Sequence, residues 1–210
     1  FPQGLEIPTR SMMTGLIGAA MGIDRSETEL LQRLQDTMTI AIAVRRSGVE
    51  LTDYQTADLG KAFMRGPMWW HKPETGEVGV VERKGAASTR EGRRPQHRRY
   101  RADAKMTVLI QLGSHSPFTA DDILSALNKP SRPLGLGRMS CPPTMQIAGH
   151  KVEADDLVAA SQTIEAELLY LPADLADPAW GDLFYSVAGT RNWRTGQHTG
   201  TDTYLQRPAA

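Results

Sequence analysis

The chain has 210 residues, which is long enough for one domain or two small ones with a real hydrophobic core. Its 24 lysines and arginines balance 24 aspartates and glutamates, and its 40% hydrophobic content is ordinary for a soluble globular protein. One cysteine excludes an internal disulfide, no apolar run approaches the roughly 20 residues that cross a bilayer, and we expect no signal peptide. These features predict a cytoplasmic protein without a membrane partner.

Two helices are the first predicted elements. Residues 9–22 carry apolar side chains at helical spacing, with Thr9 as the expected N-cap. Three positions of this helix are glycine: Gly15, Gly18 and Gly22. Their expected benefit is close approach of the backbone to a sheet or a ligand. Ser26 and Glu29 then show the pattern of a capping box, which predicts the start of a second helix.

Strict alternation of apolar and polar residues predicts strands further along the chain. We expect them at residues 37–44, 105–112 and 163–170, with a last strand at 183–188. The first of these strands should be half-buried, with one apolar face that carries Met38, Ile40, Ile42 and Val44.

A further helix is expected between the second and third strands, since Thr119 and Asp122 form another capping box. It should end near Asn128, because Pro130 disfavours a helical conformation of the residue before it. The order of elements fits an α+β fold with helices on one face of an antiparallel sheet. A ferredoxin-like or RRM-like unit matches this order if one more strand precedes Phe1.

A long insertion at residues 59–102 contains most of the clustered positive charge. From Arg83 to Arg101 there are eight lysines and arginines and one acid, whereas Glu153 to Asp182 holds eight acids and no base. Local charge decides what a surface attracts, because salt screens charges beyond about 8 Å. The insertion is either a solvated loop with an aromatic anchor or a projecting arm whose arginines bind a nucleic-acid backbone. The acidic stretch would face solvent or a basic protein partner.

Residues 131–144 read SRPLGLGRMSCPPT. Three prolines and two glycines exclude a helix and interrupt any strand, so we expect a firmly held loop. Arg138 near its centre would present charge and a planar donor fork, and the glycines would let the backbone approach RNA closely. Cys141 is expected to be buried and structural, because a lone cysteine without a paired histidine is seldom catalytic.

Four segments occur in the order and at the spacing of the motifs of one known family. They are IPTRSMMTGLIGAAMGIDR at 7–25, LTDYQTAD at 51–58, RRYRADAKMTVLI at 98–110 and RPLGLGRMSCPPT at 132–144. Together they resemble the CasD family, the type I-E CRISPR Cascade subunit that caps the 5′ handle of the guide RNA. The resemblance covers most of residues 7–144, and the part of the chain after that matches poorly.

The resemblance implies an RRM-like palm, made of residues 1–58 and 103–210, with an inserted basic thumb at 59–102. Such a subunit binds the 5′ handle of the crRNA and contacts the Cascade backbone subunit and the large subunit. It meets target DNA only through the complex. No catalysis and no cofactor are implied, because a different subunit of type I-E complexes cuts the repeat.

The residues and the resemblance together give four groups of candidate RNA-binding residues. They are Thr9, Arg10 and Ser11 at the start of the first helix; Asp53 and Tyr54; Arg90, Arg93, Arg94, Arg98 and Arg99; and Gly137, Arg138 and Ser140 in the loop. Purely structural roles stand beside these. Thr9 is explained by helix capping alone. In the structural alternative, Asp53 and Tyr54 only order a turn, and Arg98 and Arg99 are solvated surface charges.

Two other functions stay open. The first is a metal-independent repeat-processing endoribonuclease of a related CRISPR subtype, for which His97, Tyr100 and Lys105 lie close enough in sequence to form a catalytic set. The second is a general RNA-binding domain outside CRISPR systems, which would show no preference for a repeat-derived handle. The five histidines are scattered and neither HxxxH nor CxxC occurs, so the sequence predicts no metal site.

Overall fold

The computed structural model describes residues 7–58, 68–71, 78–81, 93–136, 141–147, 149–177, 179 and 183–209. These residues belong to two compact units, a smaller one within Val49–Ala102 and a larger one within Leu5–Gly48 and Asp103–Ala210. Much of 59–92 lies outside the described residues, so the predicted thumb boundaries stay a prediction. In the part of the chain that the structure describes, no helix is long and apolar enough to cross a membrane.

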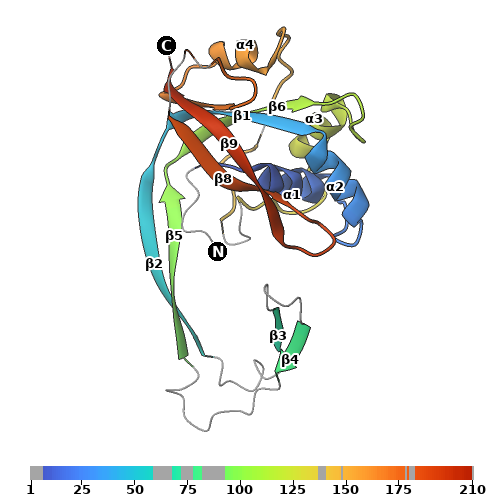
Figure 1. Cartoon of the computed structure of the whole chain (residues 1–210), viewed down its shortest axis with the longest axis vertical. Coiled ribbons are helices and arrows are strands. Elements are labelled where there is room, and N and C mark those ends of the chain that lie inside the picture. The colour runs from blue at the N-terminus through green and yellow to red at the C-terminus, as the bar shows by residue number, and fades with distance from the viewer. Residues whose placement is uncertain are drawn as a thin grey trace. The chain divides into compact units, whose positions relative to one another are not determined.

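The larger unit is built on an antiparallel sheet of five strands in the order β6-β1-β7-β9-β8 (Figure 1). The strands are β1 (Met38–Arg46), β6 (Lys105–Leu112), β7 (Leu168–Pro172), β8 (Phe184–Arg191) and β9 (His198–Pro208). The longest pairing joins β1 to β6, with Ile40 opposite Ile110 and Ile42 opposite Val108. At the other side of β1, Ile42 lies opposite Tyr170 of β7, so β1 is an interior strand.

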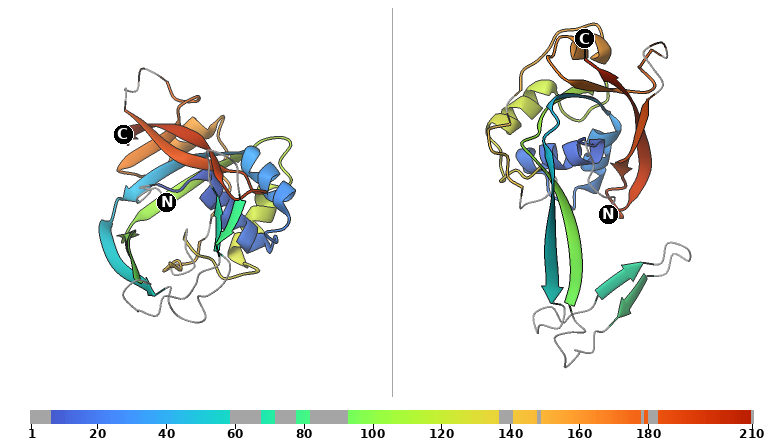
Figure 2. Two further views of the ribbon diagram at one scale, coloured as in Figure 1. Left: turned by 60° about the horizontal axis from the view of Figure 1, so that its bottom comes forward. Right: turned by 90° about the vertical axis from the view of Figure 1, so that its left-hand side faces the viewer.

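Helices cover both faces of this sheet. Figures 1 and 2 show α1, α2 and α3 together on one face and α4 on the other. Their bounds are Arg10–Met21, Thr28–Asp36, Ala120–Asn128 and Leu157–Gln162. The main core joins Ile17 of α1, Leu34 of α2 and Ile123 of α3 to the sheet, and a smaller core packs Leu157 of α4 on Ala41. This architecture confirms the predicted ferredoxin-like α+β fold, although a helix also covers the second face.

The first helix forms as its sequence predicts. Thr9 is the N-cap, and its Oγ1 accepts a hydrogen bond from the Met12 amide at 3.3 Å. Gly22 ends the helix in the left-handed region with φ of 76°, which a residue with a side chain rarely adopts. Gly18 permits the expected close packing, because a Cβ there would lie 2.8 Å from Cδ2 of Leu31 in α2.

The two predicted capping boxes have opposite outcomes. Thr119 and Asp122 form theirs at the start of α3. The Thr119 hydroxyl and amide both donate to the Asp122 carboxylate, which lowers the pKa of that carboxyl. The box predicted from Ser26 and Glu29 is wrong. Asp24 accepts the Ser26 amide and hydroxyl instead, at 3.0 and 2.8 Å, and α2 begins at Thr28 without a side-chain cap.

Several strand predictions need correction. The first strand is buried on both faces rather than half-buried, since Ala41 and Ala43 on its second face are fully buried and α4 covers that side. The strand expected at 163–170 begins only at Leu168. The amides of Thr163 and Ile164 close the end of α4 instead, by donating to the Ala160 and Ser161 carbonyls at 3.3 Å. The strand at 183–188 is present as β8 but is not the last one, since β9 follows it.

The described residues of the smaller unit form two separate pairs of antiparallel strands. The long pair is β2 (Val49–Asp58) with β5 (Arg93–Ala102), which we call the ribbon. The short pair is β3 (Met68–His71) with β4 (Val78–Val81). The described part of the basic insertion is therefore β-structure.

Candidate nucleic-acid interface

The register of the ribbon decides which side chains share a face. Asp53 lies opposite Arg98, and Tyr54 lies opposite His97, over ten consecutive pairs without a bulge. Because side chains alternate between faces along a strand, the two pairs belong to opposite faces. Asp53 and Tyr54 therefore lie in the middle of a strand, and the alternative role of ordering a turn is wrong.

The face of the ribbon that carries Tyr54 presents an exposed aromatic pair. The Tyr54 and His97 ring centroids are 5.2 Å apart with an interplanar angle of 59°. Tyr54 remains 60% exposed, which is high for a large side chain that has an aromatic partner. Exposed aromatic rings next to positive charge are the usual platform on which single-stranded bases stack.

Positive charge predominates on the ribbon. Five arginines lie on β5, at 93, 94, 98, 99 and 101, against the acids Glu50, Asp53 and Asp58 of β2. Arg99 shares the face of the aromatic pair, and its Nε lies 3.6 Å from Oε1 of Glu50. Both of these side chains are nearly half exposed, so the ion pair is weak and exchangeable. Arg93 and Arg94 are placed on β5 by their backbone alone.

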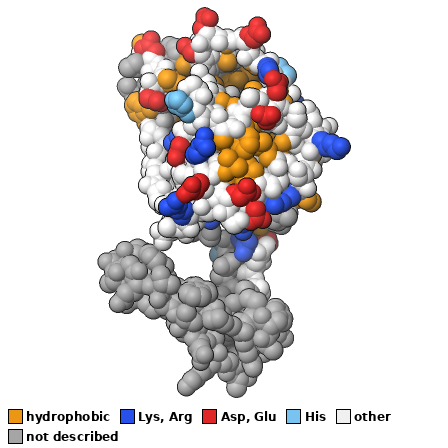
Figure 3. Space-filling model, turned by 90° about the vertical axis from the view of Figure 1, so that its right-hand side faces the viewer, with side chains coloured by type: hydrophobic (Ala, Val, Ile, Leu, Met, Phe, Trp, Pro, Cys, Tyr) orange, Lys and Arg blue, Asp and Glu red, His pale blue; other side chains and the backbone are white. Residues whose placement is uncertain are grey.

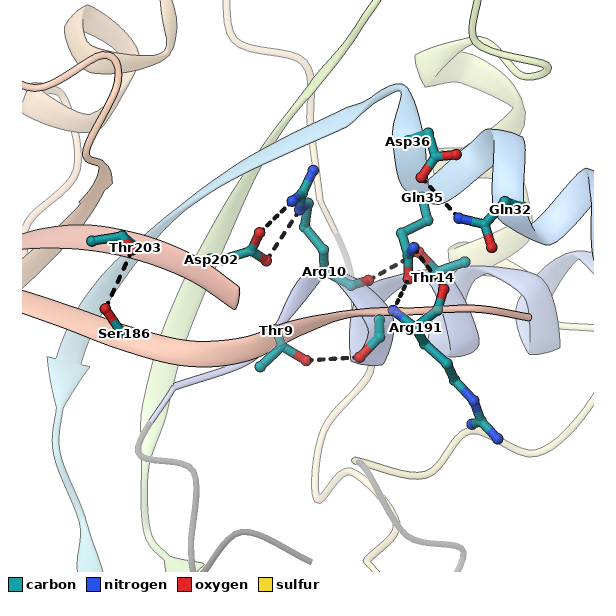
Figure 4. A network of polar contacts seen from close by, with 11 residues as sticks. Thr9, Arg10, Thr14, Gln32, Gln35, Asp36, Ser186, Arg191, Asp202 and Thr203 are labelled. Carbon is teal, nitrogen blue, oxygen red and sulfur yellow. Dashed lines mark hydrogen bonds and ion pairs between the residues drawn. The ribbon is translucent and has the colours of Figure 1, made fainter. Parts of the chain in front are cut away.

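Arg10 belongs to an ion pair that is more buried than the Arg99–Glu50 pair of the ribbon. It is the first residue of α1, and its guanidinium donates to both carboxylate oxygens of Asp202 on β9, with Nε 3.1 Å from Oδ2 (Figure 4). The hydrogen bond to Asp202 raises the pKa of Arg10, while partial burial opposes that rise. Gly189 of β8 makes room for this carboxylate, because a Cβ at that position would overlap it. The ion pair ties the start of α1 to the sheet.

Thr9 and Ser11 are also directed inward. Both are buried, and their hydroxyl oxygens are 3.1 Å apart. Thr9 caps α1, so the structural explanation given for it from the sequence is confirmed. Burial of these two hydroxyls leaves little of either side chain at the surface for a ligand to contact.

The described flanks of the 131–144 loop are firmly held, as expected. Arg132 donates from its guanidinium to the carbonyl oxygens of Gly22 and Ile23, both at 3.1 Å, at the carboxyl end of α1. The Leu136 amide donates to the Cys141 carbonyl at 2.8 Å. Cys141 itself is only partly buried, which corrects the expectation of full burial. The candidates Arg90, Gly137, Arg138 and Ser140 lie outside the described residues.

A buried glutamine network was missed by sequence reasoning. Gln35 of α2 is 1% exposed and bonds to the turn that joins β8 to β9. Its Oε1 accepts from the Arg191 amide at 3.1 Å and the Trp193 indole at 3.2 Å, and its Nε2 donates to the Arg191 carbonyl at 2.9 Å. The only sequence signal was a polar residue on the apolar stripe of α2, which does not identify its partners.

The proposed catalytic set for RNA cleavage is not assembled in the ribbon. His97 and Tyr100 are three residues apart on β5, so they project from opposite faces. Lys105 belongs to β6 in the larger unit. Among the described residues, no group of three or more histidine, cysteine, aspartate or glutamate side chains could hold a metal ion.

The fold and the ribbon define a class of protein, in which a ferredoxin-like α+β unit is combined with a basic β-ribbon that carries exposed aromatic side chains. The model of the family described as CRISPR-associated protein (Cas_Cas5) matches residues 3–196. The chain belongs to this family of CRISPR-associated proteins.

Individual proteins of known name are also similar to this chain. The "CRISPR system Cascade subunit CasD" of Escherichia coli (strain K12) is 29% identical over 159 residues, covering 72% of this chain and 62% of that protein. The chain thus spans less than two thirds of the length of this curated relative. A solved structure described as a "CRISPR RNA-guided surveillance complex" has the same fold, with a TM-score of 0.61 and 21% identity over 98% of this chain and 80% of the other. A second solved structure, of a Cas protein, gives a TM-score of 0.48 and 19% identity over 97% of this chain and 80% of the other.

Proposed function

We propose that this chain is the non-catalytic subunit of a cytoplasmic type I-E CRISPR Cascade complex that binds and caps the 5′ handle of the crRNA in antiviral defence. The observation that carries the proposal is the ribbon face on which the exposed Tyr54–His97 pair lies beside Arg99. Membership of the CRISPR-associated family and the Cascade subunit among its relatives support the same function.

The chemistry of this face suits single-stranded RNA. A base that stacks on an aromatic side chain contributes about 1–3 kcal/mol to binding, and each of the four bases can stack in this way. Arginine adds a planar fork that pairs with phosphate oxygens. Arg99 can exchange its partner at little cost, since it leaves an exposed carboxylate that water solvates again. The ribbon therefore supplies both contacts that a flexible strand needs.

Binding to labelled RNA tests the proposal. The purified protein is titrated with a pre-cut 5′-handle RNA and with a scrambled RNA of equal length, at several salt concentrations. We expect preference for the handle, and a loss of roughly 5- to 100-fold in affinity for Tyr54→Ala. Arg99→Gln should lower the slope of log affinity against log salt by about 0.7, the value for one phosphate contact on a single strand. Equal binding of both RNAs would refute handle recognition.

A matched control separates the ribbon from general charge effects. Arg45 of β1 lies 2.5 Å from Glu165 and has an exposure similar to that of Arg99, so Arg45→Gln removes one surface arginine elsewhere. We expect its affinity and salt slope to stay close to those of the unchanged protein. A denaturing gel of uncut repeat RNA, incubated with EDTA, tests catalysis in parallel. A discrete cut would establish the endoribonuclease instead.

Contact with the Cascade backbone and large subunits is the second part of the proposal. It is supported by Leu183 and Phe184, which are 61% and 58% exposed at the start of β8, an edge strand of the sheet. Exposed apolar side chains beside an open strand edge favour protein contacts. Phe184→Asp should reduce co-purification with one of these subunits, whereas Met145→Asp, at a 68% exposed position, should not. Undiminished recovery of both subunits with Phe184→Asp would contradict this part.

A further inference from the structure

The turn between β8 and β9 holds an arginine that no described acid neutralises. Arg191 is the last residue of β8, and Gln35 fixes its backbone by accepting from its amide and donating to its carbonyl (Figure 4). These bonds come from a side chain that is 1% exposed. The position from which the guanidinium extends is therefore set by the core and not by the solvent-exposed turn.

The indole of Trp193 is fixed by the same helix. Its Nε1 donates to Gln35, and its backbone amide donates to Oε1 of Gln32 at 3.1 Å. The ring also lies against α1, since a Cβ on Gly15 would be 3.7 Å from it. Trp193 is thus a rigid surface rather than a mobile side chain.

The Arg191 guanidinium lies over this surface. Its Cζ is 5.3 Å from the centre of the Trp193 ring, a distance at which the cation is attracted to the ring face. Gly196 approaches from another direction, and a Cβ there would lie 3.1 Å from Nη2 of Arg191. Trp193 and Gly196 restrict the orientation of the guanidinium, which reduces the entropy lost when a ligand binds.

The donors of this guanidinium are not used within the described residues. No described carboxylate lies within ion-pair distance of Arg191, although Arg10, Arg45, Arg99, Arg132 and Arg194 each have one. Its Nε is buried and has no hydrogen-bond partner in the described part of the chain. The buried Nε is out of reach of a ligand, so the two terminal amino groups of the guanidinium, which are not buried, are the donors that a phosphate can contact.

We propose that Arg191 binds a phosphate group of the RNA backbone, as a contact separate from the ribbon. This inference rests on the proposed function, in which RNA is the ligand. Residues 189–200 favour phosphate over a protein carboxylate, because they carry two arginines, one histidine and no acid, together with several hydroxyl and amide side chains. One face of the larger unit shows positive and negative side chains interspersed (Figure 3), so that face offers no continuous positive track. We expect Arg191 to make one localised phosphate contact, because Arg194 of the same turn is already paired with Glu29.

RNA titration of Arg191→Gln tests the inference. We expect handle affinity to fall about tenfold, as for a lost hydrogen bond to a charged group, and the salt slope to fall by about 0.7. Arg191→Lys should recover only part of the loss, because lysine keeps the charge but lacks the planar fork. The control is again Arg45→Gln, whose arginine is paired with Glu165. Unchanged affinity and slope in Arg191→Gln would overturn the inference.

A spectroscopic measurement reports on the position itself. The indole N–H signal of Trp193, assigned by its loss in Trp193→Phe, should shift when handle RNA is added to the unchanged protein and shift little in Arg191→Gln. A smaller shift in the same direction with inorganic phosphate would show that phosphate alone is recognised. An indole signal that RNA leaves unmoved would overturn the inference.

The two proposals fail in distinguishable ways. If the unchanged protein does not bind RNA, the proposed function fails and the inference fails with it. If the unchanged protein binds RNA and Tyr54→Ala weakens binding while Arg191→Gln does not, only the inference fails. Thermal unfolding of Arg191→Gln at an unchanged midpoint would confirm that a loss of affinity does not come from misfolding.

Discussion

Replacing Gln35 by leucine tests how strongly the core holds the β8–β9 turn. The change keeps the approximate size of the side chain and removes three hydrogen bonds, to the Arg191 amide, the Arg191 carbonyl and the Trp193 indole. A neutral hydrogen bond contributes about 1 kcal/mol net, and a buried group left without a partner adds about 1–3 kcal/mol. Gln35 is 1% exposed, so water cannot replace it without opening the turn. We expect the free energy of unfolding to fall by about 3–4 kcal/mol.

Urea unfolding, followed by circular dichroism and tryptophan fluorescence, measures this loss. The matched control is Gln32→Leu on the same helix, a partly exposed residue that accepts one bond from the Trp193 amide and donates one, at the surface, to Asp36. It should lose only about 1 kcal/mol. The reasoning would be refuted if Gln35→Leu lost less than about 1 kcal/mol while the slope of the unfolding free energy against urea concentration stayed unchanged. Other contacts than this network would then hold the turn.

Two further predictions concern the helix glycines and a buried phenol. Gly18→Val should lower the free energy of unfolding by about 1–3 kcal/mol, since its Cβ would lie 2.8 Å from the buried Leu31 side chain, while Gly15→Ala should raise it by up to about 1 kcal/mol. A loss in both, measured by urea unfolding, would contradict this. Burial raises the pKa of Tyr204, so its stabilising effect is complete below about pH 10, the ordinary tyrosine pKa, and is lost as the pH rises further. The urea midpoint should therefore fall less above about pH 10 in Tyr204→Phe, and an equal fall would contradict the assignment.

Local hydrogen bonds made parts of this fold predictable. Thr9 and Thr119 each accept a hydrogen bond from an amide three residues further along the chain. Such a short separation makes the cap predictable from the local sequence pattern. The same reasoning failed at Ser26, because Asp24, two residues away, accepts its hydrogen bonds in place of Glu29, three residues away. A pattern of residue types does not rank two acceptors that both lie close along the chain.

Non-local burial was less accessible to sequence reasoning. In β9 the adjacent residues Tyr204 and Leu205 are both buried, on opposite faces of the sheet, so apolar residues do not alternate there and the strand was missed. Helix α4 is only six residues long, too short for a helical period to be recognised. Because α4 was missed, nothing indicated that Ala41 and its neighbours would be covered on the second face.

The candidate interface shows the same limit. The sequence indicated a basic arm and the candidates Tyr54 and the arginines, but the contact between the Tyr54 and His97 rings depends on the register of β2 with β5. The Gln35–Arg191 contact joins residues 156 positions apart and has no local signature. Such pairs follow from tertiary structure, whereas charge clustering is visible in the sequence alone.

Ion-pair energetics also rank the candidate arginines for RNA binding. To bind a phosphate, Arg10 would have to release Asp202, which is 9% exposed, and leaving a buried carboxylate unpaired costs about 3–5 kcal/mol. Arg99 would release Glu50, which is 45% exposed, at a cost below about 1 kcal/mol. A phosphate contact of about 1.5–3 kcal/mol, the range for hydrogen bonds to charged groups, exceeds the second cost but not the first. We therefore expect Arg10 to act by holding α1 on the sheet, and Arg99 to contact the RNA.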